Sequence, residues 1–317
     1  MSPALLVVHP GALGDVVLVF GLIAELRRHF APVALMARSE VARLAAEEGL
    51  ADEALALESA WTASLFSGRP EPRAHSRLAP YSHALAFARS PELADGLRAI
   101  ARAGVCALSP RPEPGLRLHA ADHAWSAVKA CGLLPADAVP RLPPRRASAP
   151  AHGAAVLIHP GAGSPRKRWP IERFRAVAAA VESEGGRVEY VLGPADGDLR
   201  PRLANVAIVH IPQDTLALRR LLASGRAYVG NDSGVSHLAA WLGLPSVVVF
   251  GPSDPVRWRP IGENVEVVRP PLACAPCFEI ASVNCERPDC ILEISLADVL
   301  QALKRVTGVA ASETGGG

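Results

Sequence analysis

This chain of 317 residues has few lysines, almost no net charge and no long hydrophobic segment. Its 33 lysine and arginine residues nearly balance 31 aspartate and glutamate residues, for a formal net charge of +2. This balance, with the basic residues scattered, argues against a nucleic-acid-binding protein. The first apolar run covers only residues 4–8, which is too short for a signal peptide or a membrane span. We therefore expect a cytoplasmic protein.

Alternating strand and helix patterns predict two α/β domains. Half of the residues are hydrophobic, and the length is about twice that of a usual single domain. The chain opens with an apolar run, the loop HPGALGD and a helical pattern, and the same order returns at HPGAGSPRKRWP from His159. A repeated opening of this kind predicts two similar halves with parallel sheets. We place the domains at residues 1–150 and 151–317, with a Pro-rich linker over residues 134–153.

Short β-branched and apolar runs mark the later strands. We predict strands at residues 81–88, 187–192, 227–230 and 246–250, whereas residues 59–80 have an irregular pattern. Open parallel sheets bind ligands beyond the carboxyl ends of their strands. The loops that follow strands are therefore the places to look for chemistry.

The loop after the first strand contains Gly11 and Gly14 but lacks the G-x-G-x-x-G spacing, which argues against a nicotinamide cofactor. Asp15 follows at the start of a helix. One interpretation is a first-turn carboxylate favoured by the helix dipole. The other is a general base that takes a proton from a hydroxyl nucleophile.

The corresponding loop of the second half, GAGSPRKRW, places Ser164, Arg166, Lys167 and Arg168 after glycines. Backbone N–H groups and a cation in such a loop suit a phosphate or diphosphate, although a solvated basic loop is the alternative. The order G-x-x-x-x-G-K-[ST] is missing, which argues against P-loop ATP hydrolysis. Asp196, which follows the strand at residues 187–192, is a candidate for ribose hydroxyls or a plain turn residue.

The segment VGNDSGVSHLAAWLG puts Asp232, Ser233, Gly234 and His237 between two hydrophobic runs. The N–H groups at the start of the helix form a ready anion site. In the alternative interpretation, Asp232 and Ser233 cap this helix without binding a ligand, and His237 faces the core. Neither serine lies in G-x-S-x-G, so the segment does not match a hydrolase nucleophile elbow.

Three segments together resemble glycosyltransferase family 9, the ADP-heptose:lipopolysaccharide heptosyltransferases. They are GALGDVVLVFGLIAELRR, HPGAGSPRKRWPIERFRAV and GNDSGVSHLAAWLGLPSVVVFGPSDPVRWRPIG. The last is the most specific, because D-[ST]-G-x-x-H-x-A-A followed by G-x-P and a strand ending in F/Y-G is characteristic of this family. His9 and Pro10 depart from the family, which more often has a basic residue and a short polar one there.

The resemblance implies a GT-B architecture, in which two Rossmann-like domains face a cleft. It also implies inverting transfer of a sugar, typically from ADP-heptose, to a hydroxyl of the lipopolysaccharide inner core. Asp15 matches the general base proposed for the family, and Lys167 matches its diphosphate-binding lysine. Asp196 lies near the position that contacts the ribose, and the remaining donor-binding positions correspond to Asp232, Ser233, Gly234 and His237. The N-terminal domain would bind the acceptor and the C-terminal domain the nucleotide sugar.

The six cysteines divide into two groups. Cys106 and Cys131 look like isolated apolar residues. The other four form C-x2-C-x7-C-x4-C, for which structural zinc, disulfides and free or cluster-binding thiols all remain open. They are Cys274, Cys277, Cys285 and Cys290. Four thiolates leave no open coordination position, so a catalytic metal is not expected, and transfer needs no cofactor.

Two alternatives to heptosyl transfer stay open. One is a GT-B enzyme that uses another nucleotide sugar, and the other is a non-catalytic sugar-nucleotide-binding protein. A lipid acceptor predicts peripheral contact with the inner face of the cytoplasmic membrane through arginines of the first domain, or these are ordinary solvated charges. The arginines are Arg69, Arg73, Arg77, Arg98 and Arg102.

Overall fold

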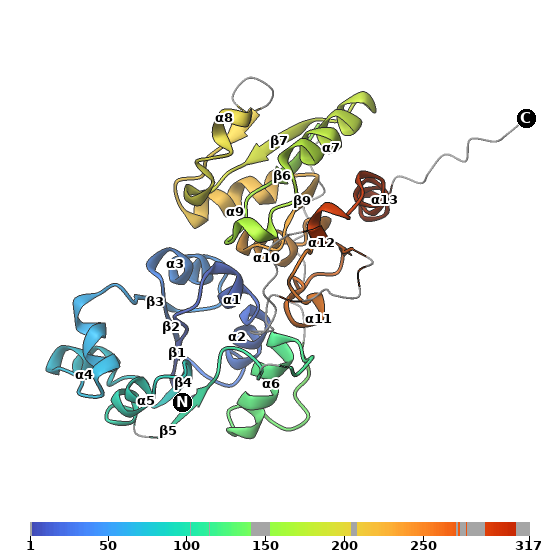
Figure 1. Cartoon of the computed structure of the whole chain (residues 1–317). Helices are drawn as coiled ribbons and strands as arrows, with labels where there is room; N and C mark the ends of the chain where they lie inside the picture. Colours follow the sequence, from blue (N-terminus) through green and yellow to red (C-terminus); the bar gives the residue numbers. More distant parts are fainter. Residues whose placement is uncertain are drawn as a thin grey trace, which may run out of the picture. The chain divides into compact units, whose positions relative to one another are not determined.

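A computed structural model of the chain describes residues 2–101, 103–113, 115–140, 153–203, 208–270, 272, 277 and 289–308. The chain divides into two compact units, Met1–Pro144 and Arg145–Gly317. The first unit is coloured from blue to green and the second from light green to red (Figure 1). Each unit is built on one parallel sheet.

The sheet of the first unit has the strand order β3-β2-β1-β4-β5. Its central strand is buried along its whole length, as expected for a parallel strand with helices on both faces. The strands are β1 (Leu5–Val8), β2 (Val33–Ala37), β3 (Glu53–Ala56), β4 (His83–Phe87) and β5 (Gly104–Leu108). The helices are α1 (Leu13–Val17), α2 (Phe20–Leu26), α3 (Ser39–Glu47), the 3₁₀ helix η1 (Ala60–Ser67), α4 (Pro72–Leu78), α5 (Pro91–Arg98) and α6 (Ala120–Ala130).

The sheet of the second unit has the order β11-β10-β9-β6-β7-β8. Helices α7 and α13 pack on it through a core that includes Trp169 and Phe174, whose rings meet edge to face. The strands are β6 (Val156–His159), β7 (Val188–Val191), β8 (Ile208–His210), β9 (Ala227–Asn231), β10 (Ser246–Val249) and β11 (Val265–Val268). The helices are η2 (Pro165–Lys167), α7 (Ile171–Ser183), η3 (Pro194–Asp196), α8 (Arg200–Leu203), α9 (Thr215–Ser224), α10 (Gly234–Trp241), α11 (Pro255–Trp258), α12 (Asp289–Leu292) and α13 (Leu296–Thr307).

The two sheets share one topology. In each, the first three strands run to one side of the sheet, and the chain then returns to the other side of its first strand. The direction therefore reverses between β1 and β4 in the first unit and between β6 and β9 in the second. Such switch points are where open parallel sheets bind ligands. The prediction of two similar doubly wound α/β halves is confirmed.

Two local predictions in the first unit are wrong. Residues 59–80, expected to be irregular, form η1 and α4, which bury Leu65 and Leu78 against the sheet. Cys106 and Cys131, expected to be isolated, form a disulfide with a Cα–Cα distance of 5.8 Å. The reason is that β5 and the C-terminal end of α6 lie side by side, which a separation of 25 residues in sequence does not reveal.

Several expectations fall on segments that the structure does not describe. The linker predicted over residues 134–153 lies mostly within residues 141–152, which are outside the described part of the chain. The same holds for Cys274 and Cys285. Among the described helices, none combines the length and the apolar character that crossing a membrane requires.

Candidate functional site

The loops that follow β6, β7 and β9 are joined by side-chain bonds at the carboxyl edge of the second sheet. The β6 loop, residues 160–170, carries Lys167 and Arg168. Lys167 pairs with Asp232, which follows β9, and Arg168 pairs with Asp196, which follows β7. This edge is the switch point of the sheet, so the cluster lies where the fold binds ligands.

Lys167 and Asp232 form a close ion pair, with 2.6 Å between Nζ and Oδ2. The side chain of Lys167 is 21% exposed and that of Asp232 is 6% exposed. Lys167 ends the single turn of η2, whose backbone closes with a bond from Lys167 N to Ser164 O. The loop therefore holds one ammonium group directly against one carboxylate.

Helix α10 begins directly beside this pair. Ser233 is its N-cap, and the Ser233 hydroxyl accepts from the backbone N–H of Ser236. Gly234 is the first helical residue, so the N-terminal N–H groups of α10 lie two residues from Asp232. The predicted capping role of Ser233 is thus present, and the helix start also offers donors to an anion. The side chain of His237 is buried on the first turn.

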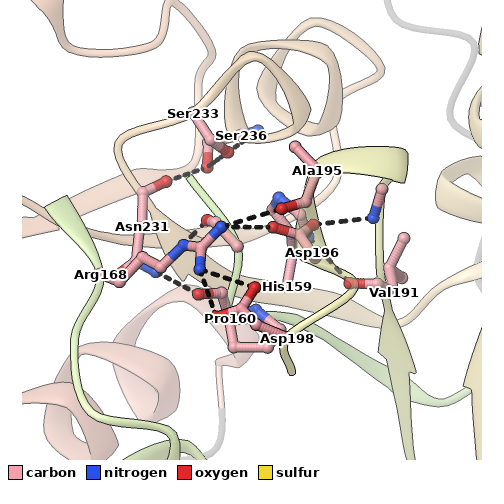
Figure 2. A network of polar contacts seen from close by, with 12 residues as sticks. His159, Pro160, Arg168, Val191, Ala195, Asp196, Asp198, Asn231, Ser233 and Ser236 are labelled. Carbon is pink, nitrogen blue, oxygen red and sulfur yellow. Dashed lines mark hydrogen bonds and ion pairs between the residues drawn. The ribbon is translucent and has the colours of Figure 1, made fainter. Parts of the chain in front are cut away.

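Arg168 connects the β6 loop to the β7 loop (Figure 2). Its Nη1 donates to both carboxylate oxygens of Asp198 at 3.0 and 2.9 Å. Its Nη2 donates to Asp196 Oδ1 and to Ala195 O, both at 3.2 Å. A guanidinium group suits this task because its donors form a rigid fork.

Asp196 and Asp198 differ sharply in exposure. The Asp196 side chain is 4% exposed, and its Oδ2 accepts from Gly193 N at 2.8 Å. The Asp198 side chain is 64% exposed. Of these two carboxylates, Asp198 faces solvent, whereas Asp196 is held inside the loop.

Gly161 leaves room for the carboxylate of Asp196 in the neighbouring β7 loop. A Cβ at Gly161 would collide with both carboxylate oxygens of Asp196. A Cβ at Gly163, by contrast, would meet no heavy atom within 4 Å. Only the second of these glycines therefore borders open space.

His159 is the buried residue on the inner side of this network. Its Nδ1 lies 2.8 Å from Val191 O, to which it donates, and 4.0 Å from Asp196 Oδ2 (Figure 2). Burial lowers the pKa of His159 below its ordinary value, and this effect outweighs the hydrogen bond to Val191 O and the charge of Asp196, both of which raise it. The imidazole is therefore neutral at pH 7 and has a structural role under the site.

Asn231 was quoted in the sequence motif but not recognised as part of the site. Its buried side chain accepts from Trp169 N and donates to Pro160 O and Gly161 O. The available signal was an amide at the end of a strand at the switch point. The sequence cannot supply the partners, which lie 62 to 71 residues away.

The other two residues predicted in the β6 loop lie toward solvent. Ser164 is half-buried and precedes η2, and Arg166 is exposed within it. Both are on the same loop as Lys167, which the structure brings to Asp232.

In the first unit, the loop after β1 is shaped by His9. The backbone N–H of Gly11 donates to His9 Nδ1 at 3.1 Å, and the His9 ring lies 4.6 Å from that of Phe87 at the end of β4. Burial lowers the pKa of His9 to about 4. A Cβ at Gly11 would lie 2.7 Å from His9 Cε1 and 2.8 Å from Asp15 Cβ, so this position requires glycine.

Asp15 lies in the first turn of α1 and is half-buried. Its Oδ2 accepts from Ala12 N at 3.2 Å, which fixes the carboxylate at the start of the helix. Gly14 is the second residue of the same helix. The first-turn role considered for Asp15 is therefore present, at the switch point of the first sheet.

Residues 134–286 match the sequence model of glycosyltransferase family 9 (heptosyltransferase). The resemblance to glycosyltransferase family 9 is thereby confirmed. The matched segment contains the whole Lys167 and Asp232 cluster.

Curated heptosyltransferases share sequence with part of this chain. Lipopolysaccharide heptosyltransferase 1 of Escherichia coli K12 is 35% identical over 121 residues, which are 37% of this chain and 38% of that protein. The enzyme of the same name from Pseudomonas aeruginosa is 33% identical over 130 residues, 39% of this chain and 36% of that protein. The matched regions thus span little more than a third of the length of these curated relatives.

Solved structures of the family share the fold over nearly the whole chain. A family 9 glycosyltransferase from Veillonella parvula has a TM-score of 0.74 at 17% identity and covers 98% of this chain and 99% of its own. The ADP-heptose lipopolysaccharide heptosyltransferase II of E. coli has a TM-score of 0.71 at 20% identity and covers 97% and 98%. The predicted GT-B type of fold, with two parallel-sheet α/β domains, is confirmed by this likeness.

The hypothesis that the four C-terminal cysteines bind a metal is only partly addressed by the comparisons and the structure. One structural neighbour, TibC of E. coli, is an iron-containing glycosyltransferase, with a TM-score of 0.61 at 18% identity over 96% of this chain and 76% of its own. Here Cys277 and Cys290 are described, and both are buried. Within the described residues, no three side chains of the metal-binding types cluster. Two of the four cysteines lie outside that part, so the zinc hypothesis stays a prediction.

Proposed function

We propose that this protein is an inverting glycosyltransferase that moves heptose from ADP-heptose to a hydroxyl of the lipopolysaccharide inner core. The observation that carries the proposal is the Lys167 and Asp232 pair beside the N-terminus of α10. This arrangement lies at the switch point of the sheet and within the segment that matches family 9.

The proposed donor site uses charge that the fold already holds in place. The diphosphate would take the ammonium of Lys167 and the N–H groups at Gly234 as partners. Both would stabilise the negative charge that grows on departing ADP, and one preorganised interaction of this kind is typically worth about 3 kcal/mol. Asp232 would then be released from Lys167 and could accept hydrogen bonds from the sugar. In this scheme the carboxylate beside the lysine is a second substrate contact.

Contacts to the adenosine would come from the β7 loop. The prediction named Asp196 for the ribose hydroxyls, and Asp196 supports this loop through Arg168. Asp198 is the exposed carboxylate of the same loop. We propose that the loop as a whole meets the nucleoside, with Ser164, Arg166 and His237 as further contacts around the diphosphate.

Asp15 is the proposed general base. Its carboxylate would take the proton of the acceptor hydroxyl while the hydroxyl oxygen forms a bond to the anomeric carbon. The bond from that carbon to the diphosphate breaks at the same time, and ADP leaves with the electron pair. A single displacement from the opposite face inverts the configuration. The backbone N–H of Ala12 holds Asp15 in position, and Gly11 leaves room for the side chains of His9 and Asp15 in the same loop.

The proposal requires no metal, because the ammonium of Lys167 and the N–H groups at the start of α10 would face the leaving diphosphate. It places the protein at the inner face of the cytoplasmic membrane, where the lipid-linked acceptor would be found. The first unit would bind that acceptor and the second the nucleotide sugar.

Thermal shift measurements test the donor assignment. Wild-type protein is compared with Lys167→Ala, Asp15→Ala and Lys304→Ala in the presence of ADP-heptose, ADP, UDP, GDP or NAD. A ligand that binds only the folded state at 100 times its Kd adds about 2.7 kcal/mol to the free energy of unfolding. We expect ADP-heptose and ADP to raise the Tm of the wild type, Asp15→Ala and Lys304→Ala. Lys304 is the matched control because it also pairs with a carboxylate, that of Glu184.

We expect Lys167→Ala to lose this stabilisation. A shift with UDP or GDP alone would keep the nucleotide-sugar site but replace ADP-heptose as donor. If donor binds and is never consumed with lipopolysaccharide core acceptors, the protein is a sugar-nucleotide-binding protein and the transferase assignment fails.

A further inference from the structure

One side chain, that of Asn231, forms hydrogen bonds with both ends of the loop that carries Lys167. Asn231 is the last residue of β9 and is fully buried. Its Nδ2 donates to Pro160 O at 2.8 Å and to Gly161 O at 3.3 Å, where the loop begins. Its Oδ1 accepts from the backbone N–H of Trp169 at 2.9 Å, where the loop ends.

The backbone of Asn231 is tied to helix α10 as well. The Ser236 hydroxyl donates to Asn231 O at 2.5 Å (Figure 2). It also lies 2.9 Å from the hydroxyl of Tyr228. Ser233, the N-cap of α10, lies 3.2 Å from the same Ser236 hydroxyl. One residue thus connects the Lys167 loop, the end of β9 and the first turn of α10.

We infer that Asn231 is a positioning residue that holds the ammonium of Lys167 against Asp232 at the start of α10. Asp232 is the next residue in the chain, so fixing the loop on Asn231 sets the distance between Lys167 and its partner. The inference rests on the proposed function only for the identity of the anion that this cluster binds.

The chemistry at this position demands an amide of this length. It must accept one hydrogen bond and donate two, and the side chain of asparagine offers both functions in one plane. An aspartate in its charged form keeps the acceptor and lacks the donors, and a leucine of similar shape lacks both. Because Asn231 is buried, water cannot readily replace the lost bonds, and the two ends of the loop would separate.

The reactivity of Lys167 measures its placement without any ligand. The chain has three lysines, at positions 129, 167 and 304, so limited acylation with an N-hydroxysuccinimide acetate followed by peptide mass spectrometry reports each one. The amine of Lys167 lies 2.6 Å from the Asp232 carboxylate, so this contact must open before the reagent reaches the nitrogen, and acylation is slow. Lys304 and Lys129 serve as internal references in the same sample.

Two variants of Asn231 and one matched control are compared. Asn231→Leu removes all three bonds, and Asn231→Asp removes the two that the amide donates. The control is Asn264→Leu, since Asn264 also donates to a backbone carbonyl of the second unit, Val306 O, at 2.6 Å. Circular dichroism and Tm identify the variants that remain folded, and Asn231→Asp serves where the leucine variant does not fold.

We expect acylation of Lys167 relative to Lys304 to rise about fivefold or more in the Asn231 variants, as for a change of local equilibrium of ordinary size. The ratio should stay unchanged in Asn264→Leu.

An unchanged ratio in a folded Asn231 variant overturns the inference. So does an equal rise in Asn264→Leu, because the loss of any side-chain amide hydrogen bond would then act alike. A parallel wild-type experiment with ADP separates the two claims. If ADP does not protect Lys167, the nucleotide site fails, while the placement of Lys167 by Asn231 is still decided by the ligand-free ratios.

Discussion

Protonation of His9 should destabilise the first unit at mildly acidic pH. The His9 side chain is buried, its Nδ1 accepts from Gly11 N, and burial lowers its pKa from the ordinary 6.5 to about 4. A protonated ring can no longer accept this bond. The loop that carries Asp15 would therefore lose one of its internal supports.

The size of the effect follows from the difference between the folded and unfolded pKa values. Above pH 6.5 His9 is neutral in both states and contributes no pH dependence. Between pH 6.5 and pH 4 the unfolded state binds more protons, so the free energy of unfolding falls as the pH falls. Each pKa unit is worth 1.36 kcal/mol, so the full loss below the folded pKa is about 3 kcal/mol.

Urea unfolding of the wild type and of His9→Asn between pH 4 and pH 8 provides the assay. The asparagine oxygen can still accept from Gly11 N, but it does not titrate. The other groups titrate alike in both proteins, including His159, whose pKa burial also lowers. The difference between the two curves therefore isolates His9. Parallel curves across the whole range would show that His9 is not held neutral by the fold and would refute the argument.

Three further changes have defined outcomes. Reducing the Cys106–Cys131 disulfide frees a loop of 25 residues and should lower the free energy of unfolding by about 3.5 kcal/mol, from the lost loop-closure entropy. Dithiothreitol should therefore lower the Tm of the wild type but not that of Cys106→Ser. Gly161→Ala should cost about 1–3 kcal/mol in urea unfolding, because its methyl group collides with the Asp196 carboxylate, whereas Gly163→Ala has open space and should cost less. Lys167→Ala leaves the buried Asp232 carboxylate without its lysine and should lower the free energy of unfolding by about 3–5 kcal/mol at pH 7. Adding Asp232→Asn should recover much of this loss, and additive losses in the double variant would contradict a coupled pair.

The sequence allowed the fold and the loops of the site to be predicted well. Strands such as β9 and β10 read as short apolar runs, and parallel pairing then places all the loops after them at one edge of the sheet. The proximity of Lys167 and Asp232, 65 residues apart, follows from that rule once β6 and β9 are neighbours. The family resemblance led to the same two loops independently.

The side-chain partners inside the site could not be predicted. Arg168 was seen as one of several basic residues, yet it joins two carboxylates of another loop. Asn231 was not singled out within its motif, yet it bonds to both ends of the Lys167 loop. Such pairings depend on rotamers and on exact loop paths, which hydrophobic periodicity does not encode. The disulfide was missed for the same reason, because its two cysteines belong to different elements.

The repeated HPG of the two halves separates residues that serve the fold from residues that serve function. In each half the histidine at the end of the first strand is buried with a lowered pKa. In each half the glycine two residues later has no room for a Cβ, beside Asp15 in one unit and Asp196 in the other. The shared residues are thus explained by packing at the switch point. Asp15 in the first unit and Lys167 in the second differ between the two loops, and the proposed transfer reaction would give them distinct roles.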